Sequence, residues 1–364
     1  MATIVNTLIE GLSQQMVQAR LNSIDAKSFL FGTHFPVKKI VGFNWKTLQN
    51  QLAKKNVAAD LHSDNSTILR KRRPIFESAR GDLPFIIISR EMTRSELKEY
   101  QTAAALAGDD DAVKLVQYWG DDVDFCFNGV QSELEYIAWA LASNGGRLAF
   151  TTNNNATYAN EFDLDYDVDA AQKRKTSSDW GESGSADIIG DLARDIKFAK
   201  SLGLNPKYAF VNLETFYKVC SAEQVIKACA SYLANAVGVA QTPDLAQVNS
   251  MLAKQAWLNG IQLIVIDQDI TREYSDGRES TTGNPFASDR LILSESARLG
   301  TTQYDILAEN SDLILRAERS HTVIKKYGTA EPQSEVTIGL ADAIPVFDSA
   351  YRNLYVRTDG KDWE

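Results

Sequence analysis

One long apolar repeat, in residues 110–143, constrains the fold of this chain more than any other feature of its sequence. Apolar and small residues recur there at alternating spacings of three and four, which is the spacing of one face of an α-helix. This face consists of Val113, Val116, Gly120, Val123, Phe127, Val130, Leu134, Ile137 and Leu141. Asn144-Gly145-Gly146 follows and predicts the C-terminus of the helix. Roughly 30 residues at 1.5 Å per residue span about 45 Å, longer than the usual helix of a compact domain.

A helix of this length can be a coiled-coil segment, a member of a helical bundle, or a spine that supports other layers of the fold. A bundle requires partner helices of similar length, and this repeat occurs in a single copy. The sequence therefore favours the spine.

The residues before this helix predict an arm and a projecting hairpin. Residues 1–35 are moderately amphipathic, which predicts a helix and then an extended arm that ends near Pro36 and could dock on a neighbouring molecule. Alternating apolar residues in 41–48 predict one strand, and the apolar run 85–88 predicts a second. The polar stretch 53–82 lies between them, so we expect the two strands to form a hairpin.

Two capping boxes mark predicted helix starts. Thr93 with Glu96, and Ser221 with Gln224, have the spacing at which a hydroxyl and a carboxylate or amide satisfy backbone N–H groups reciprocally. We therefore expect helices to begin near Arg94 and near Ala222.

The chain beyond the long helix predicts a mixed helix and strand domain followed by strands. Predicted strands are 162–168 (with an acidic outer face), 208–211, 261–266, 291–293, 313–315, 323–327, 336–338 and 354–356, and predicted helices are 188–199, 213–219, 222–235 and 244–259. Residues 170–186 are polar and predict a loop or a domain boundary. The order of these elements does not give the repeated strand–helix series of a doubly wound enzyme, so the fold class is α+β.

Composition narrows the possible partners. The net charge is −10 and the pI is near 5, so the chain as a whole is a poor ligand for nucleic acid. The basic cluster Arg70, Lys71, Arg72 and Arg73 is interpreted as a partner-protein contact or a solvated loop. The apolar runs are too short for a membrane span, and the N-terminus lacks the pattern of a secretory signal, so we expect the chain to mature in a cytoplasm.

Few residues favour catalysis or metal binding. The three cysteines have no CxxC spacing, and the three histidines are isolated in sequence, so no cofactor and no metal site are predicted. Asp267 and Asp269 follow a predicted buried strand in a DxDxT pattern that occurs in metal-dependent phosphatases. Such a site also needs further carboxylates and a phosphate-binding lysine, and the polar end of a strand is the simpler interpretation.

The order of these parts resembles the major capsid proteins of tailed bacteriophages, in particular the family of the lambda head protein E. The resemblance is carried by the N-terminal arm, by the strand 41–48 and the polar stretch after it, by Arg72 to Thr93 with its sequence FIIISREMT, and by the helix 110–143. It is also carried by the closing segment from His321-Thr322-Val323-Ile324-Lys325-Lys326-Tyr327 through Ala343-Ile344-Pro345-Val346-Phe347 to Tyr355-Val356. It covers nearly the whole chain. The large number of residues between Tyr217 and Gly260 is a departure from that family's pattern.

The resemblance implies the Johnson-type (Hong Kong 97-like) capsid fold. The implied parts are an N-terminal arm (1–39), an E-loop (40–90), a peripheral domain (91–186) with the spine helix 110–143, an axial domain (187–300), and a β-rich return to the peripheral domain (301–364). Arg70 to Arg73 would then lie in the E-loop, as residues that contact an adjacent subunit.

The resemblance also implies a function. The chain would be a structural protein without enzymatic activity, which assembles into pentamers and hexamers of an icosahedral head around double-stranded DNA. Partners would be other copies of the chain, a portal, a scaffold, decoration proteins and packaged DNA bound without sequence specificity. The location would be the virion capsid, after assembly in the host cytoplasm. The alternatives are an encapsulin-like cargo shell and a metal-dependent phosphatase that uses Asp267 and Asp269.

Overall fold

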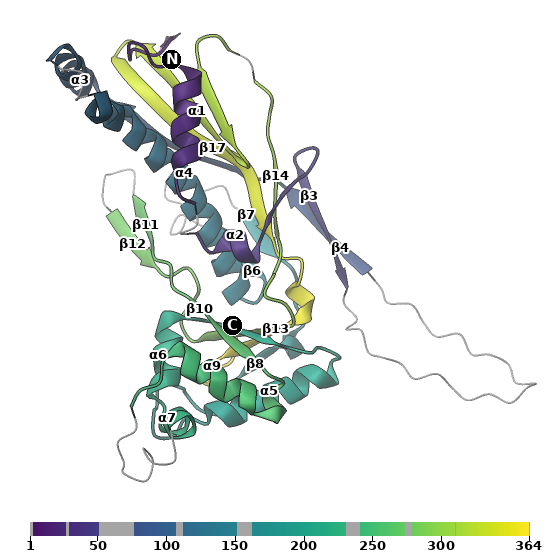
Figure 1. Cartoon of the computed structure of the whole chain (residues 1–364). Helices are drawn as coiled ribbons and strands as arrows, with labels where there is room; N and C mark the ends of the chain where they lie inside the picture. Colours follow the sequence, from purple (N-terminus) through teal and green to yellow (C-terminus); the bar gives the residue numbers. More distant parts are fainter. Residues whose placement is uncertain are drawn as a thin grey trace, which may run out of the picture. The chain divides into compact units, whose positions relative to one another are not determined.

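Two compact units make up the chain in a computed structural model (Figure 1). The described residues are 3–26, 29–50, 76–106, 112–150, 162–230, 241–273, 279–309 and 311–363. Unit 1 comprises residues 1–45, 80–135 and 301–346, and unit 2 comprises residues 46–79, 136–300 and 347–364. None of the helices described here is long and apolar enough to traverse a lipid bilayer.

The predicted long helix is present as α4 (Ala112–Ser143), with 32 residues. It ends where the sequence predicts, because Gly145 and Gly146 adopt φ values of 67° and 82° that residues with a side chain rarely adopt. Residues of α4 up to Glu135 belong to unit 1, and residues from Tyr136 onward belong to unit 2.

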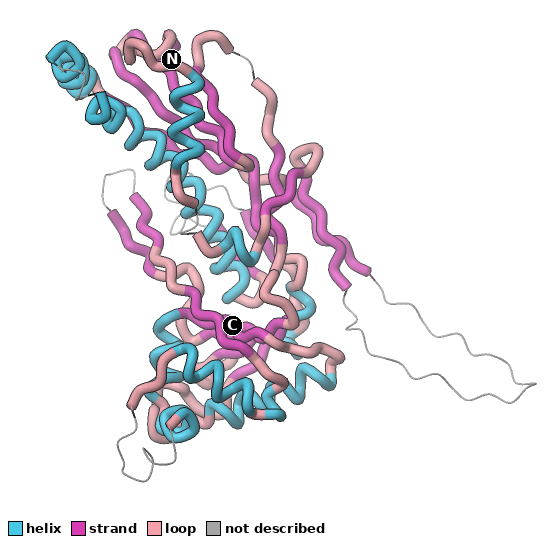
Figure 2. Tube along the Cα trace, in the orientation of Figure 1, coloured by secondary structure: helices cyan, strands magenta, loops and turns pink. Residues whose placement is uncertain are grey.

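Unit 1 is built on a seven-stranded sheet with the order β1-β16-β17-β14-β2, in which β15 also pairs with β16 and β5 with β17. Its strands are β1 (Ile4–Val5), β2 (Val37–Lys39), β5 (Phe85–Met92), β14 (Thr301–Asp305), β15 (Leu315–Arg319), β16 (Thr322–Ala330) and β17 (Gln333–Val346). Segment 301–346 is mostly strand (Figure 2), as its alternating sequence predicts.

The backbone of α4 lies very close to this sheet. A Cβ atom added at Gly339 of β17 would be 2.5 Å from the carbonyl oxygen of Cys126, and one at Gly129 of α4 would be 2.5 Å from Ile88. Cys126 Sγ also donates to the carbonyl oxygen of Thr337 at 3.4 Å. Glycine is therefore required at Gly339, because a side chain there would meet the backbone of the helix, whereas at Gly129 the neighbouring atom is the end of the flexible Ile88 side chain.

The N-terminal segment packs against unit 1 and is less helical than predicted. Helix α1 (Gln14–Ser23) begins at Ser13, whose hydroxyl accepts from the N–H of Met16. Residues before α1 form β1 on the edge of β16 instead of a first helical turn. The remaining helices of this unit are α2 (Phe31–His34) and α3 (Arg94–Leu106). At the start of α3, Glu96 accepts from the N–H and the hydroxyl of Thr93, both at 2.7 Å.

The predicted hairpin has a different second strand. β3 (Asn44–Asn50) pairs with β4 (Phe76–Asp82) in a two-stranded sheet, while the apolar strand β5 pairs with β17. The prediction that 41–48 pairs with 85–88 was wrong, because β5 pairs along its whole length with the longer strand β17, and such cross-strand pairs stabilise a sheet. Residues 51–75, between β3 and β4, lie outside the described residues.

Unit 2 contains a five-stranded sheet with the order β10-β9-β13-β18-β8. Its strands are β8 (Lys173–Lys175), β9 (Tyr208–Asn212), β10 (Gln262–Ile266), β13 (Arg290–Ser294) and β18 (Asn353–Arg357). The accompanying helices are α5 (Ile188–Ser201), α6 (Leu213–Ser221), α7 (Glu223–Cys229) and α9 (Leu245–Lys254), with 3₁₀ turns at Ala170–Gln172, Ala256–Leu258 and Ala350–Arg352. Two hairpin-like pairs, β6 (Arg147–Phe150) with β7 (Phe162–Asp165) and β11 (Ile270–Glu273) with β12 (Glu279–Gly283), complete the unit.

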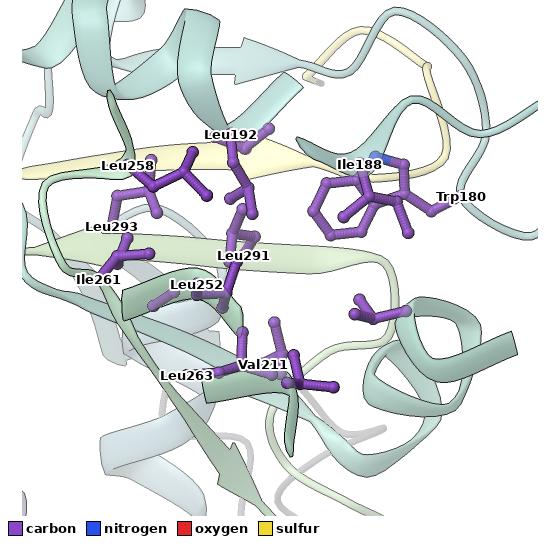
Figure 3. Close-up of a cluster of buried hydrophobic side chains, with 14 of the residues drawn as sticks. Trp180, Ile188, Leu192, Val211, Leu252, Leu258, Ile261, Leu263, Leu291 and Leu293 are labelled. Atoms are coloured by element: carbon purple, nitrogen blue, oxygen red, sulfur yellow. The ribbon is translucent and has the colours of Figure 1, made fainter. Parts of the chain in front are cut away.

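Both faces of the unit 2 sheet are buried. Figure 3 shows one face, where Val211, Leu263 and Leu293 of the strands meet Ile188 and Leu192 of α5. On the other face, the ring centroids of Phe210 and Trp139, the latter from the end of α4, are 6.3 Å apart. Strand β9 is accordingly apolar at successive positions, as expected for a strand between two layers.

Three local predictions in unit 2 were wrong. Residues 170–186 were expected to be a loop, but β8 is an edge strand that pairs in parallel with β18. Ser221 and Gln224 do not form a capping box, because α7 has Ala222 as its N-cap without a side-chain hydrogen bond. The predicted helix 222–235 ends at Cys229, and residues 231–240 lie outside the described residues.

Gln224 has another role. Its Oε1 accepts from the N–H of Ile189 at 3.0 Å and its Nε2 donates to Asp187 at 2.8 Å. The side chain therefore satisfies the first turn of α5 instead of its own helix. The capping box that does exist joins Asp244 and Gln247 at the start of α9.

Candidate assembly surface

The basic cluster predicted to contact an adjacent subunit, Arg70, Lys71, Arg72 and Arg73, lies outside the described residues. Its assignment stays a prediction.

The apolar face of α4 is part of the chain's own core. Its described members are at most 2% exposed; they are Val123, Phe127, Val130, Leu134, Ile137 and Leu141. The side chains of Val113 and Val116 lie outside the described residues. Val123 and Phe127 pack with Val17 and Leu21 of α1 in one cluster, and Arg20 Nε donates to Asp124 at 2.9 Å. This face therefore attaches α4 to its own subunit.

Asp267 and Asp269 are exposed residues that follow β10. No group of three His, Cys, Asp or Glu side chains in the described part of the chain is arranged to hold a metal ion. The acidic residues of β7 also have a partner, because Arg147 lies 3.8 Å from Asp163 and 3.7 Å from Asp165. The exposed position of Asp267 and Asp269 after β10 fits the simpler interpretation, the polar end of a strand.

One face of the unit 1 sheet carries exposed apolar side chains. Phe85 and Ile87 of β5 are 58% and 55% exposed. Ile87 pairs directly with Leu340 of β17, so their side chains lie on the same face. Phe85, Ile87, Val336, Ile338 and Leu340 form this surface, which we call the open sheet face. It lies opposite the face that packs on α4, because Ile88 and Gly339 contact the helix.

A cavity of about 130 Å³ opens beside the open sheet face. Its apolar lining comes from Phe85, Ile306, Leu307, Val323 and Leu340, and its polar lining from Asp305, Glu309, Arg316, His321, Lys325 and Asp342. Leu307 at its margin is 63% exposed. A cavity of this size accommodates one side chain of a partner molecule.

Two carboxylates stand side by side at this cavity. Asp305 and Asp342 are direct partners in the pairing of β14 with β17. Asp305 accepts from the N–H of Gly42 at 2.8 Å and of Ile306 at 2.9 Å, whereas Asp342 has no hydrogen bond and no ion pair with any described residue. Burial raises the pKa of Asp342, the neighbouring Asp305 raises it further, and Lys325 opposes both effects. Like charges in opposite positions destabilise a sheet, so a cation from a partner would be favourable here.

On the other face of the sheet, a buried charged cluster holds the N-terminal segment. The side chains of Lys326 and Glu335 are both 0% exposed, with Nζ and Oε1 4.0 Å apart. Glu335 accepts from the hydroxyl of Thr7 at 2.7 Å and from the N–H of Leu8 at 2.8 Å, and Lys326 donates to Thr337 at 2.8 Å. A buried charge requires such partners, so residues 3–26 are tied to their own subunit.

Asp122 of α4 completes this cluster. It is 7% exposed, and its Oδ2 has no hydrogen-bond partner among the described atoms, while its Oδ1 lies 3.5 Å from Arg90. Burial raises the pKa of Asp122, an effect that Lys326 and Arg90 oppose. Burial also lowers the pKa of Lys326, against the influence of Glu335 and Asp122.

The sequence analysis missed these cluster residues, although one signal was present. Residues Ile324, Lys326 and Gly328 occupy alternate positions of a predicted strand, and the first is apolar. A lysine on an apolar strand face indicates either an exposed edge or a buried ion pair. Sequence alone gives no means of finding its partner Glu335 on the next strand.

No protein-family model matches the sequence, and no curated protein matches it either. Solved structures match it over its whole length. A phage-related protein from Bordetella bronchiseptica RB50 aligns with 100% of this chain and 100% of its own length, at 12% identity and a TM-score of 0.54. A protein assigned as the capsid protein of a prophage of Escherichia coli CFT073 aligns over 95% of this chain and 99% of its own, at 14% identity and a TM-score of 0.57.

The chain therefore has the fold of phage capsid proteins. The predicted α+β, Johnson-type capsid fold is confirmed. The division of that fold into arm, E-loop, peripheral domain and axial domain stays a prediction. The sheet of unit 2 recruits β8 and β18 from outside residues 187–300.

Proposed function

We propose that this chain is a major capsid protein, which assembles into pentamers and hexamers of an icosahedral phage head around double-stranded DNA. The observation that carries the proposal is the match of the whole chain to the prophage capsid protein, with 95% and 99% of the two chains covered. A likeness of that extent covers both units of the chain.

The open sheet face supports this proposal. Exposed apolar side chains on a sheet are characteristic of surfaces that bind another protein. The cavity beside them has three carboxylates, Asp305, Glu309 and Asp342, against the two cations Arg316 and Lys325, and the sequence carries its densest cluster of cations at Arg70 to Arg73. Charge complementarity favours the docking of this cluster from a second copy onto the cavity.

A structural function agrees with the placement of the candidate catalytic residues. Asp267 and Asp269 are exposed after β10, and phosphoryl transfer requires several groups that converge on one phosphate. In this proposal the chain has no enzymatic activity and uses no cofactor. Its partners are other copies, a portal, a scaffold and decoration proteins, and it assembles in the host cytoplasm before it becomes part of the virion.

Electron microscopy of the purified protein, alone and with the scaffold of its phage, tests the proposal. Rings, tubes or closed shells are expected, with pentameric and hexameric units in the averaged images. A protein that stays monomeric at high concentration in both preparations would overturn the proposal. Particles purified from phage-producing cells should also protect double-stranded DNA from nuclease; particles filled with a cargo enzyme would favour the encapsulin-like alternative.

A further inference from the structure

The edge strand β8 has an unusual concentration of positive charge. Lys173, Arg174 and Lys175 follow one another on the outermost strand of the unit 2 sheet (Figure 1). The whole chain carries a net charge of −10, so three consecutive cations on one strand require an explanation. Lysine on an edge strand often serves only to prevent pairing with another strand.

The outer edge of β8 is already occupied by other groups. The N–H of Lys173 donates to the carbonyl oxygen of Ala170, and Arg194 Nη2 donates to the carbonyl oxygen of Lys175 at 3.1 Å. Two backbone groups that face away from β18 therefore already have partners. Because the edge is protected in this way, protection against strand pairing does not account for the lysines.

These cations line a surface pocket of about 320 Å³. The pocket also contains the rings of Phe198 and Trp363 and the carboxylate of Asp362. Arg290 stacks on the Trp363 ring, with 4.6 Å from its guanidinium carbon to the ring centroid. The pocket thus combines amino groups with the faces or edges of two aromatic rings.

The cations differ in how strongly they are engaged. Arg174 is committed to the protein, because it lies 2.9 Å from the buried Asp195 and stacks on Phe198 at 4.2 Å. Lys175 pairs with Asp362 at 2.8 Å, but these side chains are 47% and 86% exposed, and an exposed pair of this kind is weak. The side chain of Lys173 makes no hydrogen bond or ion pair with any residue that the structure describes. Lys173 and Lys175 are therefore available to an external anion.

We propose that the pocket at β8 binds the phosphodiester backbone of double-stranded DNA. Lys173 and Lys175 contact phosphate oxygens, and Trp363 and Phe198 contact the sugars between them. Amino groups and phosphates pair without reference to base sequence. The proposal rests on the proposed function, since it assigns the residues through which the shell meets packaged DNA.

The affinity of a single pocket is low, because two lysines displace few counterions from DNA. A shell repeats the pocket many times along the same molecule, so that weak contacts add. Weak contacts also let DNA slide during packaging, which a strongly basic wall would prevent. An acidic chain with a small basic pocket at β8 meets both conditions.

The test measures binding of a short fluorescent DNA duplex of random sequence to the full-length protein over a range of salt concentrations. The double variant Lys173→Gln, Lys175→Gln is compared with Lys38→Gln, Lys39→Gln, which removes two exposed lysines from the edge strand β2. The first variant should lower the association constant about tenfold at low salt and reduce the slope of log K against log salt by about 1 to 2. The second variant should change the association constant and the slope by less than about a fifth as much as the first.

A third variant, Asp362→Asn, removes the competing carboxylate and should raise the affinity. A variant that had merely lost its fold would not bind more tightly. Equal losses in the two lysine double variants, or an unchanged affinity in all three, would overturn the proposal. Tighter binding of polyglutamate than of DNA by the same pocket would also overturn it, in favour of an acidic protein segment.

This test can fail independently of the proposed function. Shells that form normally from the Lys173→Gln, Lys175→Gln protein, with DNA affinity equal to that of the unmodified protein, would remove the DNA contact and leave the capsid proposal intact. If the unmodified protein never forms shells, but the Lys173→Gln, Lys175→Gln variant still loses DNA affinity, only the capsid proposal would be overturned.

Discussion

Lys326 and Glu335 face each other inside unit 1, with neither side chain exposed and 4.0 Å between Nζ and Oε1. Glu335 also accepts from Thr7 and from the N–H of Leu8, so one carboxylate joins the N-terminal segment to the lysine on β16. Burial of two charges contributes little net stability when both partners are present, but removal of one leaves the other uncompensated.

Glu335→Ala should therefore be strongly destabilising. We expect a loss of about 3 to 5 kcal/mol in the free energy of unfolding, because Lys326 stays buried without its carboxylate. Urea denaturation measures the loss, and hydrogen exchange of residues 3–26 should accelerate. Glu223→Ala is the control, since its partner Lys227 lies on the protein surface; a loss of similar size in the control would contradict this account.

His321 makes unit 1 sensitive to acid. It is 7% exposed, and burial lowers its pKa from 6.5 to about 4. The folded state therefore holds the ring neutral while the unfolded chain takes up a proton, and stability falls as the pH decreases from about 6.5 to about 4. Over this pH range the free energy of unfolding should fall by about 3 kcal/mol. Thermal denaturation across this pH range should show that the stability of His321→Gln depends less steeply on pH than that of the unmodified protein. An unchanged dependence on pH would refute the assignment.

Asp342→Asn should separate stability from assembly. The substitution removes a like charge opposite Asp305, so the isolated subunit should gain about 0.2 to 1 kcal/mol at pH 7. The pKa of Asp342 is raised in the folded state, so this gain should vanish at a pH below the pKa values of both states. Shell formation should weaken if the carboxylate binds a cation of a second copy. Sedimentation velocity measures assembly, and stronger assembly would contradict that role.

Gly339→Ala tests the close contact between α4 and β17. The new methyl group would meet the carbonyl oxygen of Cys126 at 2.5 Å, and the backbone of a long packed helix cannot move freely. A loss of about 1 to 3 kcal/mol is expected in chemical denaturation. Gly184→Ala is the matched control, because nothing lies within 4 Å of its added Cβ.

Replacement of residues 51–75 by a short Gly-Ser linker tests the predicted E-loop. Strands β3 and β4 would still be joined, so both units should fold, which a cooperative thermal transition would show. Closed shells should be lost, because the deleted segment carries Arg70 to Arg73. Normal particles from this variant would show that the basic cluster is not needed between subunits.

Features encoded by neighbouring residues could be predicted from the sequence. Helix α4, its end before Gly145, and strands such as β9 and β10 follow from apolar spacing and local capping, which depend on residues within a few positions of one another. The order of these parts was sufficient to predict the capsid fold through a resemblance. The apolar face of α4 was also identified, although not which residues cover it.

Features that depend on distant residues could not be predicted in this way. The apolar strand β5 pairs with β17, about 250 residues later, instead of with β3, because a pairing between strands is decided by the whole set of competing partners. Lys325 and Lys326 are adjacent residues of the same type, yet Lys326 is buried with Glu335 and Lys325 lies beside the cavity. The polar run at 173–175 becomes a strand only because β18 offers it an edge. The sequence by itself determined the elements with a local apolar pattern and their order. The tertiary structure decided strands such as β8, and which charges are buried, paired or left for a partner, because those depend on contacts that no local pattern encodes.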